Sequence, residues 1–211
     1  MKDWSFTFTV KDVEVRQRTT MYEGFFEVQE LKVRHRLFEG GWSKPLSREL
    51  FVRNPAVGVL LYDPQADIVV LLEQFRVGAL EEQTGPWQLE LVAGIVEDGE
   101  GAEQVARREA REEAGCVPSR LIPMFEYLVS PGGSNEKMTL YCGIVDSAGL
   151  QGIHGLQQEG EDIRLHKLKF ASALQEINGG YINNAATIMA IQWLELNKPS
   201  VLETWNQQAE P

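Results

Sequence analysis

Hydrophobic and polar positions alternate along much of the first quarter of the chain, and a period of two residues is typical of β-strands. A turn at Glu39-Gly40-Gly41 interrupts the alternation, and Asn54-Pro55 ends it. We therefore predict a small N-terminal β domain over residues 1–53 and a second domain over residues 54–211. The strands predicted in the first domain are Phe6–Val10, Val13–Gln17, Gly24–Phe38 and Leu46–Arg53.

The pattern changes in the second domain, where apolar runs and helical periods alternate. Ala56–Tyr62 and Ile68–Leu72 are almost continuously apolar, which predicts strands buried on both faces. Further strands are predicted at Trp87–Val92, 120–129, 137–146 and Ile163–Leu168, and helices at 102–114, 170–178 and 184–197. Because strands outnumber helices, we predict an α/β (α+β) fold in which helices cover the faces of a mixed sheet.

Composition narrows the class of protein. A hydrophobic content of 43% and a charged content of 24% are ordinary for a soluble globular protein of 211 residues. No apolar run reaches membrane-spanning length, and Cys116 and Cys142 have no metal-ligand spacing, so we expect a cytoplasmic protein that binds no membrane. The net charge of −11 argues against nucleic acid as a partner.

The predicted helix 102–114 carries a cluster of carboxylates. Glu109, Glu112 and Glu113 stand at i, i+3 and i+4 and therefore share one face. Like charges at this spacing repel one another unless a cation lies among them, and oxygen ligands select a hard ion, Mg²⁺ with Mn²⁺ as a substitute. The residues alone also fit a solvated, charged surface helix.

The spacing around this cluster resembles the Nudix hydrolase box. Gly94, five residues, Glu100, seven residues, Arg108-Glu109-Ala110, one residue, Glu112-Glu113, one residue and Gly115 fill every fixed position. The last position, usually a bulky aliphatic residue, is Cys116. The resemblance implies an α/β/α sandwich that hydrolyses a nucleoside diphosphate linked to another group. It further implies that Glu109, Glu113 and the Ala93 carbonyl bind metal, and that Glu112 helps to bind or bridge a second ion.

Two other features complete the predicted catalytic group. We expect Arg108 to pair with Glu100 or Glu97 and to hold the glycine loop against the helix. In ADP-ribose-cleaving Nudix relatives a mobile acidic loop supplies a base and a metal ligand, and the acidic segment Leu156–Asp162 is similar to that loop. By this resemblance Glu159 is the base and Glu161 the ligand. Composition alone also fits a solvated loop.

The substrate is suggested by Pro131, 16 residues beyond Gly115, which resembles the marker of the ADP-ribose pyrophosphatase subgroup. The resemblance implies that Phe25 stacks on adenine, that Arg48 and Arg76 bind phosphate or ribose, and that Glu136 contacts the terminal ribose. From the residues alone, a core phenylalanine, surface arginine pairs and a plain turn remain open. Segments similar to bacterial members are Tyr22–Phe26, Arg34–Phe38, Glu73–Arg76, Gly152–Gly155 and Asn183–Ala185.

The predicted function is therefore Mg²⁺-dependent hydrolysis of ADP-ribose to AMP and ribose 5-phosphate. The resemblance also implies a homodimer whose N-terminal domains are exchanged, so that Phe25 serves the partner's site. Two alternatives stay open. One is hydrolysis of another nucleotide sugar, such as ADP-glucose or GDP-mannose. The other is a non-catalytic sensor of ADP-ribose, although such proteins tend to lose box carboxylates and to carry a basic module, and this chain does neither.

Overall fold

A computed structural model describes residues 3–206 of the chain. The chain divides into two compact units. The first runs as far as Asn54 and also contains Leu128–Lys137, whereas the second comprises Pro55–Tyr127 and the chain from Met138 onward. None of the helices within residues 3–206 is long and apolar enough to cross a membrane.

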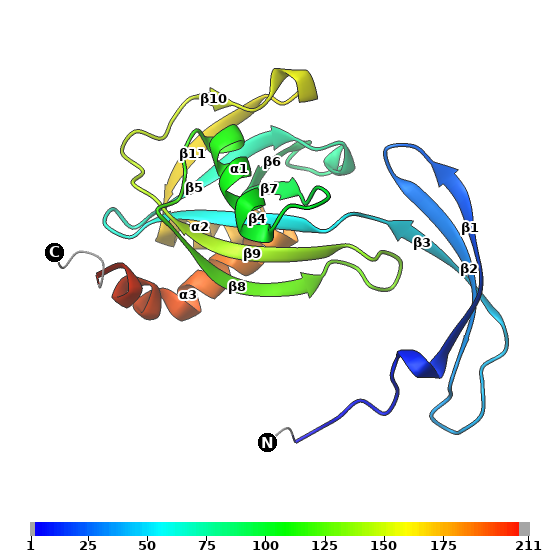
Figure 1. The fold of residues 1–211 in the computed structure, drawn as a ribbon. Coiled ribbons are helices and arrows are strands. Elements are labelled where there is room, and N and C mark those ends of the chain that lie inside the picture. Colours follow the sequence, from blue (N-terminus) through cyan, green and yellow to red (C-terminus); the bar gives the residue numbers. More distant parts are fainter. Residues whose placement is uncertain (1–2, 207–211) are drawn as a thin grey trace. The chain divides into compact units, whose positions relative to one another are not determined.

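An eight-stranded mixed sheet forms the centre of the second unit (Figure 1). Its strands are β4 (Ala56–Asp63), β5 (Ile68–Phe75), β6 (Trp87–Glu90), β7 (Val92–Ile95), β8 (Arg120–Leu128), β9 (Lys137–Ile144), β10 (Ile153–His154) and β11 (Ile163–Lys169). They run in the order β10-β11-β5-β4-β9-β8, with β6 beside β5 and β7 beside β4. The β4–β9 pair is parallel and the β4–β5 and β4–β7 pairs are antiparallel, so the sheet is mixed as predicted.

Side chains of β4 alternate between two cores, and all eight of its residues are buried. Leu60 and Tyr62 pack with α2 (Phe170–Asn178) and α3 (Ala185–Asn206). Val59 and Leu61 pack with α1 (Ala102–Ala114) on the other face. Figure 1 shows α1 on one side of the sheet and the two C-terminal helices on the other. This is the predicted sandwich, and the apolar runs of β4 and β5 are buried on both faces because helices cover both.

The first unit is a three-stranded antiparallel sheet in the order β1-β2-β3. The strands are β1 (Val13–Glu23), β2 (Glu27–His35) and β3 (Leu46–Val52), and none of their side chains is fully buried. The segment 128–137 joins this unit through β3, since the Phe51 amide donates to the Gly133 carbonyl at 2.8 Å. The sheet therefore has no buried core of its own.

Two predicted strands differ from the structure. Phe6–Val10 forms no strand, because Thr9 and Asp12 start the short 3-10 helix η1 (Val10–Asp12) instead. The Thr9 amide donates to Asp12 Oδ2 at 2.9 Å, and Thr9 Oγ1 accepts from the Lys11 amide at 3.3 Å. The single strand expected over Trp87–Val92 is two strands, of which β6 pairs with β5 and β7 with β4. The chain from position 207 onward lies outside the described residues.

Candidate metal and diphosphate site

Helix α1 and the loop before it place the carboxylate cluster. The helix spans Ala102–Ala114, as predicted, and Gly115 ends it at φ 64°, with its amide donating to carbonyls of the last turn. Its alanine stripe lies against the sheet, with Ala106, Ala110 and Ala114 wholly buried. Small side chains at these positions allow a close approach of helix to strands, which fixes the neighbouring glutamates relative to β7.

Glu113 is the most buried carboxylate of the cluster, with 2% of the residue exposed. Its Oε2 accepts a hydrogen bond from the Ala93 amide of β7 at 3.0 Å. Burial raises the pKa of Glu113 to about 8, and the charges of Glu109 and Glu161 act in the same direction. A buried carboxylate beside two others is costly without a cation, and the site therefore favours a bound positive charge.

Glu109 lies against the backbone of the glycine loop. A Cβ at Gly94 would overlap the Glu109 carboxylate, so only glycine leaves room for this side chain. Burial raises the pKa of Glu109, and the charges of Glu112 and Glu161 also raise it, whereas Arg108 lowers it. The glycine at the start of the box therefore serves to bring a carboxylate close to a strand.

Arg108 connects the loop to the helix, as predicted. Its Nε and Nη2 donate to the two oxygens of Glu100 at 3.1 Å each, and Nη2 also donates to the Ile95 carbonyl at 3.3 Å. Its Nη1 donates to Glu109 at 2.8 Å and to Glu112 at 3.2 Å. One guanidinium thus partly neutralises three carboxylates and holds the loop against α1.

The acidic loop lies beside the cluster. The Gly155 amide donates to the Glu112 carbonyl at 3.2 Å, and Glu161 Oε2 accepts from the Leu156 amide at 2.9 Å. The charge of Glu161 raises the pKa of both Glu109 and Glu113, so the three carboxylates lie within electrostatic reach of one another. Glu159 ends the 3-10 helix η3 (Gln157–Glu159) and is exposed.

The donor atoms of this cluster are all oxygens, which suits Mg²⁺ or Mn²⁺. Within residues 3–206, no group of three or more His, Cys, Asp or Glu side chains stands ready to hold a metal ion. Three carboxylates of this cluster accept hydrogen bonds from nearby donors: Glu109 from Arg108, Glu113 from the Ala93 amide and Glu161 from the Leu156 amide. The chemistry of the site fits a hard dication, and binding one requires these side chains to turn from their present partners.

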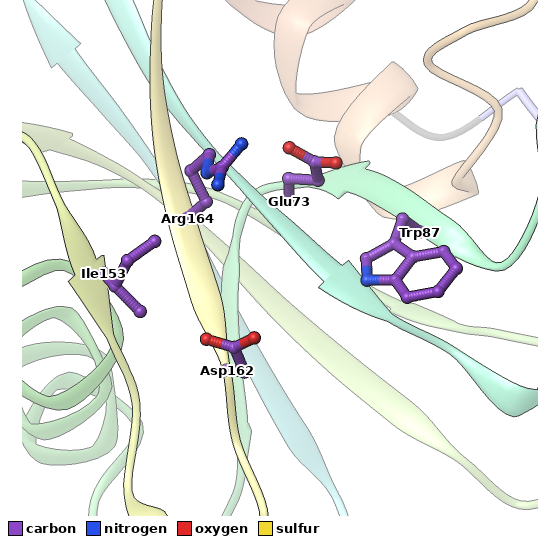
Figure 2. A pocket seen from close by; sticks show the side chains of 5 residues that line it. All are labelled: Glu73, Trp87, Ile153, Asp162 and Arg164. Atoms are coloured by element: carbon purple, nitrogen blue, oxygen red, sulfur yellow. The ribbon is translucent and has the colours of Figure 1, made fainter.

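A cavity of about 250 Å³ lies where β5, β6, β10 and β11 meet. Figure 2 shows Arg164 between Ile153 and Glu73, with Asp162 below it and Trp87 to the right of Glu73. Glu73 also bonds His166 Nε2 at 2.7 Å. Asp162 lines this cavity, whereas Glu161, the residue before it, lies near Glu109 and Glu113. The acidic loop therefore contributes carboxylates to two different sites.

Four of the predicted substrate residues belong to the first unit. Two of them, Phe25 and Arg48, lie in its three-stranded sheet and the turn between β1 and β2. Phe25 is 85% exposed in the turn between β1 and β2, where its ring meets Phe26 edge-on at 4.8 Å. This exposure excludes a core role for Phe25 and leaves its ring free to stack. Arg48, in β3, is also exposed, and its Nη1 donates to the Ser47 carbonyl at 2.8 Å.

The other two residues lie in the proline loop. Pro131 is exposed in a turn in which the Ser134 amide donates to the Ser130 carbonyl at 2.9 Å. Glu136 is not a solvated charge, because its Oε1 pairs with Arg53 at 3.2 Å and only 16% of its side chain is exposed. Arg53 also covers the Phe26 ring at 4.6 Å. Glu136 is therefore a positioned carboxylate, which the sequence did not reveal.

Sequence reasoning missed the surroundings of Arg76. The polar residues Gln88 and Glu90 of β6 are buried, at 7% and 6% exposed. Arg76 Nε donates to Glu90 Oε2 at 2.7 Å. The signal available in the sequence was a glutamate between two leucines in a strand that leads into the box.

The site combines a sheet covered by helices on both faces with a glycine-bearing loop and the glutamates of α1. These features together define a hydrolase of the α/β/α sandwich class whose metal-binding atoms are oxygens. The chain belongs to the NUDIX domain family, whose model matches residues 52–209. An ADP-ribose pyrophosphatase of Escherichia coli (strain K12) is 45% identical over 199 residues, which are 94% of this chain and 95% of that protein. One from Haemophilus influenzae is 42% identical over 203 residues, covering 95% of this chain and 94% of the relative.

More distant similarities agree with this assignment. A GDP-mannose pyrophosphatase of Cronobacter sakazakii is 33% identical over 150 residues, which cover 71% of this chain and 78% of that protein. Among solved structures, one described as an ADP compounds hydrolase superimposes with a TM-score of 0.69 at 18% identity. It covers 92% of this chain and 98% of its own, which shows a shared fold.

Proposed function

We propose that the chain hydrolyses the diphosphate bond of ADP-ribose in the presence of Mg²⁺, giving AMP and ribose 5-phosphate. The observation that carries this proposal is the convergence of Glu109, Glu113 and Glu161 beside Ala93 in a chain that matches ADP-ribose pyrophosphatases over nearly its whole length. The net charge of −11 repels a diphosphate, so cations bound at these carboxylates would be needed to attract it.

Metal binding would involve Glu109, Glu113, Glu161 and the Ala93 carbonyl, with Glu112 assisting. When bound, divalent ions supply neutralisation of the charge that develops on the diphosphate. Arg108 keeps the glutamates and the glycine loop in register through its bonds to Glu100, Glu109 and Glu112. Removing this guanidinium would leave three carboxylates without their shared counter-charge.

Glu159 would act as the base. A water oxygen forms a bond to one phosphorus while the bridging P–O bond breaks, and the water proton passes to the Glu159 carboxylate and then to solvent. The exposed position of Glu159 on η3, followed by Gly160 at φ 72°, suits a group that approaches the diphosphate from a loop. Bonds of Glu161 and Gly155 to neighbouring backbone anchor that loop near α1.

Substrate selection would involve the five residues that the resemblance names. Phe25 offers an exposed aromatic face for adenine, Arg48 and Arg76 offer guanidinium groups for phosphate or ribose, and the loop of Pro131 and Glu136 would contact the terminal ribose. The proposal includes a homodimer with exchanged N-terminal domains. Its support is the absence of fully buried side chains from β1, β2 and β3, since a sheet without a core needs another surface to cover it.

We also propose the cytoplasm as the compartment. Both cysteines are free, and burial raises the pKa of the Cys116 and Cys142 thiols to about 11 and 12. Such thiols remain protonated and unreactive at neutral pH, which suits a reducing compartment.

A metal titration with product identification tests the activity. Purified chain is incubated with ADP-ribose over a range of Mg²⁺ and Mn²⁺ concentrations, with ADP-glucose and GDP-mannose as competing substrates. We expect metal-dependent formation of equal amounts of AMP and ribose 5-phosphate, with slower turnover of the other compounds. Faster turnover of GDP-mannose would favour the activity named for the Cronobacter relative. Binding of ADP-ribose without product would favour a sensor.

A further inference from the structure

Arg76 is held by a buried carboxylate on the neighbouring strand. Glu90 Oε2 accepts from Arg76 Nε at 2.7 Å, and the Glu90 side chain is 8% exposed whereas that of Arg76 is 45% exposed. Within residues 3–206, Nε is the only side-chain nitrogen of Arg76 that donates to another group. The guanidinium is thus fixed at its inner edge, and its two terminal amino groups are available to a ligand.

Glu90 has more partners than an ordinary surface ion pair. Its Oε1 accepts from Asn184 Nδ2 at 2.8 Å, and Gln74 Nε2 approaches Oε2 at 3.4 Å. A buried carboxylate is tolerated when donors surround it, and here three side chains do so. These hydrogen bonds fix the Glu90 carboxylate, and its Oε2 therefore determines where Nε of Arg76 lies.

Asn184 connects this pair to α3. Its Oδ1 accepts from the Thr187 amide at 3.1 Å, as the residue that caps the first turn of a helix does. Thr187 Oγ1 in turn accepts from the Leu91 amide, directly after Glu90, at 3.0 Å. The helix start and the strand end are therefore locked together around one carboxylate.

Arg76 lines a cavity together with the residues that hold it. Arg76, Glu90 and Asn184 line a cavity of about 640 Å³, a volume that accommodates part of a nucleotide sugar. Burial has the largest influence on the pKa of Glu113, and the charge of Arg76 is one of those that lower it, so the guanidinium lies within electrostatic reach of the carboxylate cluster.

We propose that Glu90 and Asn184 are positioning residues for Arg76. Asn184 orients Glu90, Glu90 orients Nε of the guanidinium, and the terminal amino groups are thereby presented to the diphosphate. This inference rests on the proposed function, since Arg76 needs a diphosphate to act on. It adds two residues, one in β6 and one at the start of α3, to the group that determines how the substrate lies.

Isosteric variants test the inference on the diphosphate substrate that the unmodified chain hydrolyses fastest. Glu90→Gln keeps the shape and removes the charge. Asn184→Asp keeps the helix cap but replaces the donor that faces Glu90 by an acceptor. The double variant restores this hydrogen bond with donor and acceptor exchanged, because the amide introduced by Glu90→Gln can donate to the new carboxylate. Each is measured for kcat and KM separately and for its urea unfolding midpoint. Asn178→Asp, at an exposed position that does not line this cavity, is the matched charge control.

We expect each single variant to lower kcat/KM by about tenfold or more, as is common for groups that orient a ligand-contacting residue. The double variant should recover to within about threefold of the unmodified chain, and Asn178→Asp should cost much less than Asn184→Asp. The most informative comparison introduces Glu90→Gln into the Arg76→Ala variant and measures its effect there. If Glu90 acts through Arg76, its loss there should change kcat/KM by less than about twofold.

Two results overturn the inference while leaving the proposed function intact. One is an equal loss from Glu90→Gln with and without Arg76, which would assign Glu90 a purely structural role. The other is an unchanged kcat/KM in Glu90→Gln. Absence of diphosphate hydrolysis by the unmodified chain would instead overturn the proposed function, and the inference with it.

Discussion

Among single residues, Glu113 carries most of the electrostatic argument. It is nearly inaccessible to water, it bonds the Ala93 amide, and its pKa of about 8 means that near neutral pH it binds a proton when no cation is present. A divalent ion competes with that proton, so metal binding at this site should release protons. The same burial that makes Glu113 costly as an isolated anion makes it a strong ligand once a dication is beside it.

Replacing Glu113 by Gln should abolish ADP-ribose hydrolysis while preserving the fold. The amide has the shape of the carboxylate and can keep a hydrogen bond to Ala93, but it lacks the charge that holds a dication. We expect a loss of at least about 100-fold in kcat/KM and a weaker Mg²⁺ affinity, measured by steady-state kinetics and calorimetric titration. Glu103→Gln, an exposed position of the same helix, is the control and should behave as the unmodified chain. Retained turnover in Glu113→Gln would contradict the metal assignment.

At the scale of elements, the C-terminal end of α1 links the carboxylate helix to the acidic loop. Gly115 adopts φ 64°, and a Cβ there would lie 2.6 Å from the His154 ring of β10. The loop after β10 begins at Gly155, whose amide bonds the Glu112 carbonyl. One glycine thus allows both the end of the helix and the approach of the strand that leads to Glu159 and Glu161.

Substituting Gly115 by Ala should destabilise the protein by two separable effects. The left-handed conformation costs a residue with a Cβ about 1–2 kcal/mol, and contact with His154 adds to it. Gly180 provides the control, because its φ is 78° but a Cβ there would meet nothing within 4 Å, so Gly180→Ala should show the conformational cost alone. Urea unfolding measures both. Adding His154→Ala should bring the cost of Gly115→Ala down to that of Gly180→Ala; an unchanged cost would show that the ring is not in the way.

The elements that sequence predicted well are those fixed by local chemistry. Helix α1 was predicted to the residue, because its alanine period ends at a glycine. Strands β4 and β5 were found because they are apolar on both faces. Phe6–Val10 was wrong because the hydrogen bonds between Thr9 and Asp12 outweigh its alternation. Alternation also could not show that Glu90 is buried, since its partner Asn184 lies on a distant helix.

In the candidate site, too, local sequence patterns predicted some residues, whereas contacts between distant residues came only from the structure. The spacing of the box placed Glu109, Glu112, Glu113 and Arg108 on one helix, and the structure shows Arg108 paired with Glu100. Resemblance suggested Glu161, and the structure brings it to the cluster. The pair between Arg53 and Glu136 joins residues far apart in sequence, and no local pattern encodes such a contact.

On the scale of the whole molecule, the N-terminal sheet raises the question of what covers it. Its strands contain no fully buried side chain, and the exposed apolar residues of the first unit include Phe25 at 85% and Phe38 at 86%. Monomeric proteins rarely leave so much apolar surface uncovered. A second copy of the chain is the cover that the proposed exchange of N-terminal domains provides, and light scattering should then give twice the chain mass of 23.8 kDa.

Mixed dimers distinguish a shared site from two independent ones. One chain carries Glu113→Gln and the other Phe25→Ala, with a different affinity tag on each, so that tandem purification after co-expression yields only the mixed species. If Phe25 of one chain serves the glutamates of the other, one of the two sites contains neither substitution, and the mixed dimer should recover roughly half of the unmodified activity per dimer. If each chain uses its own Phe25, both sites are damaged and no activity returns. The two parental homodimers, each impaired at both sites, set the baseline, and a mixed dimer no more active than they are would reject the exchange.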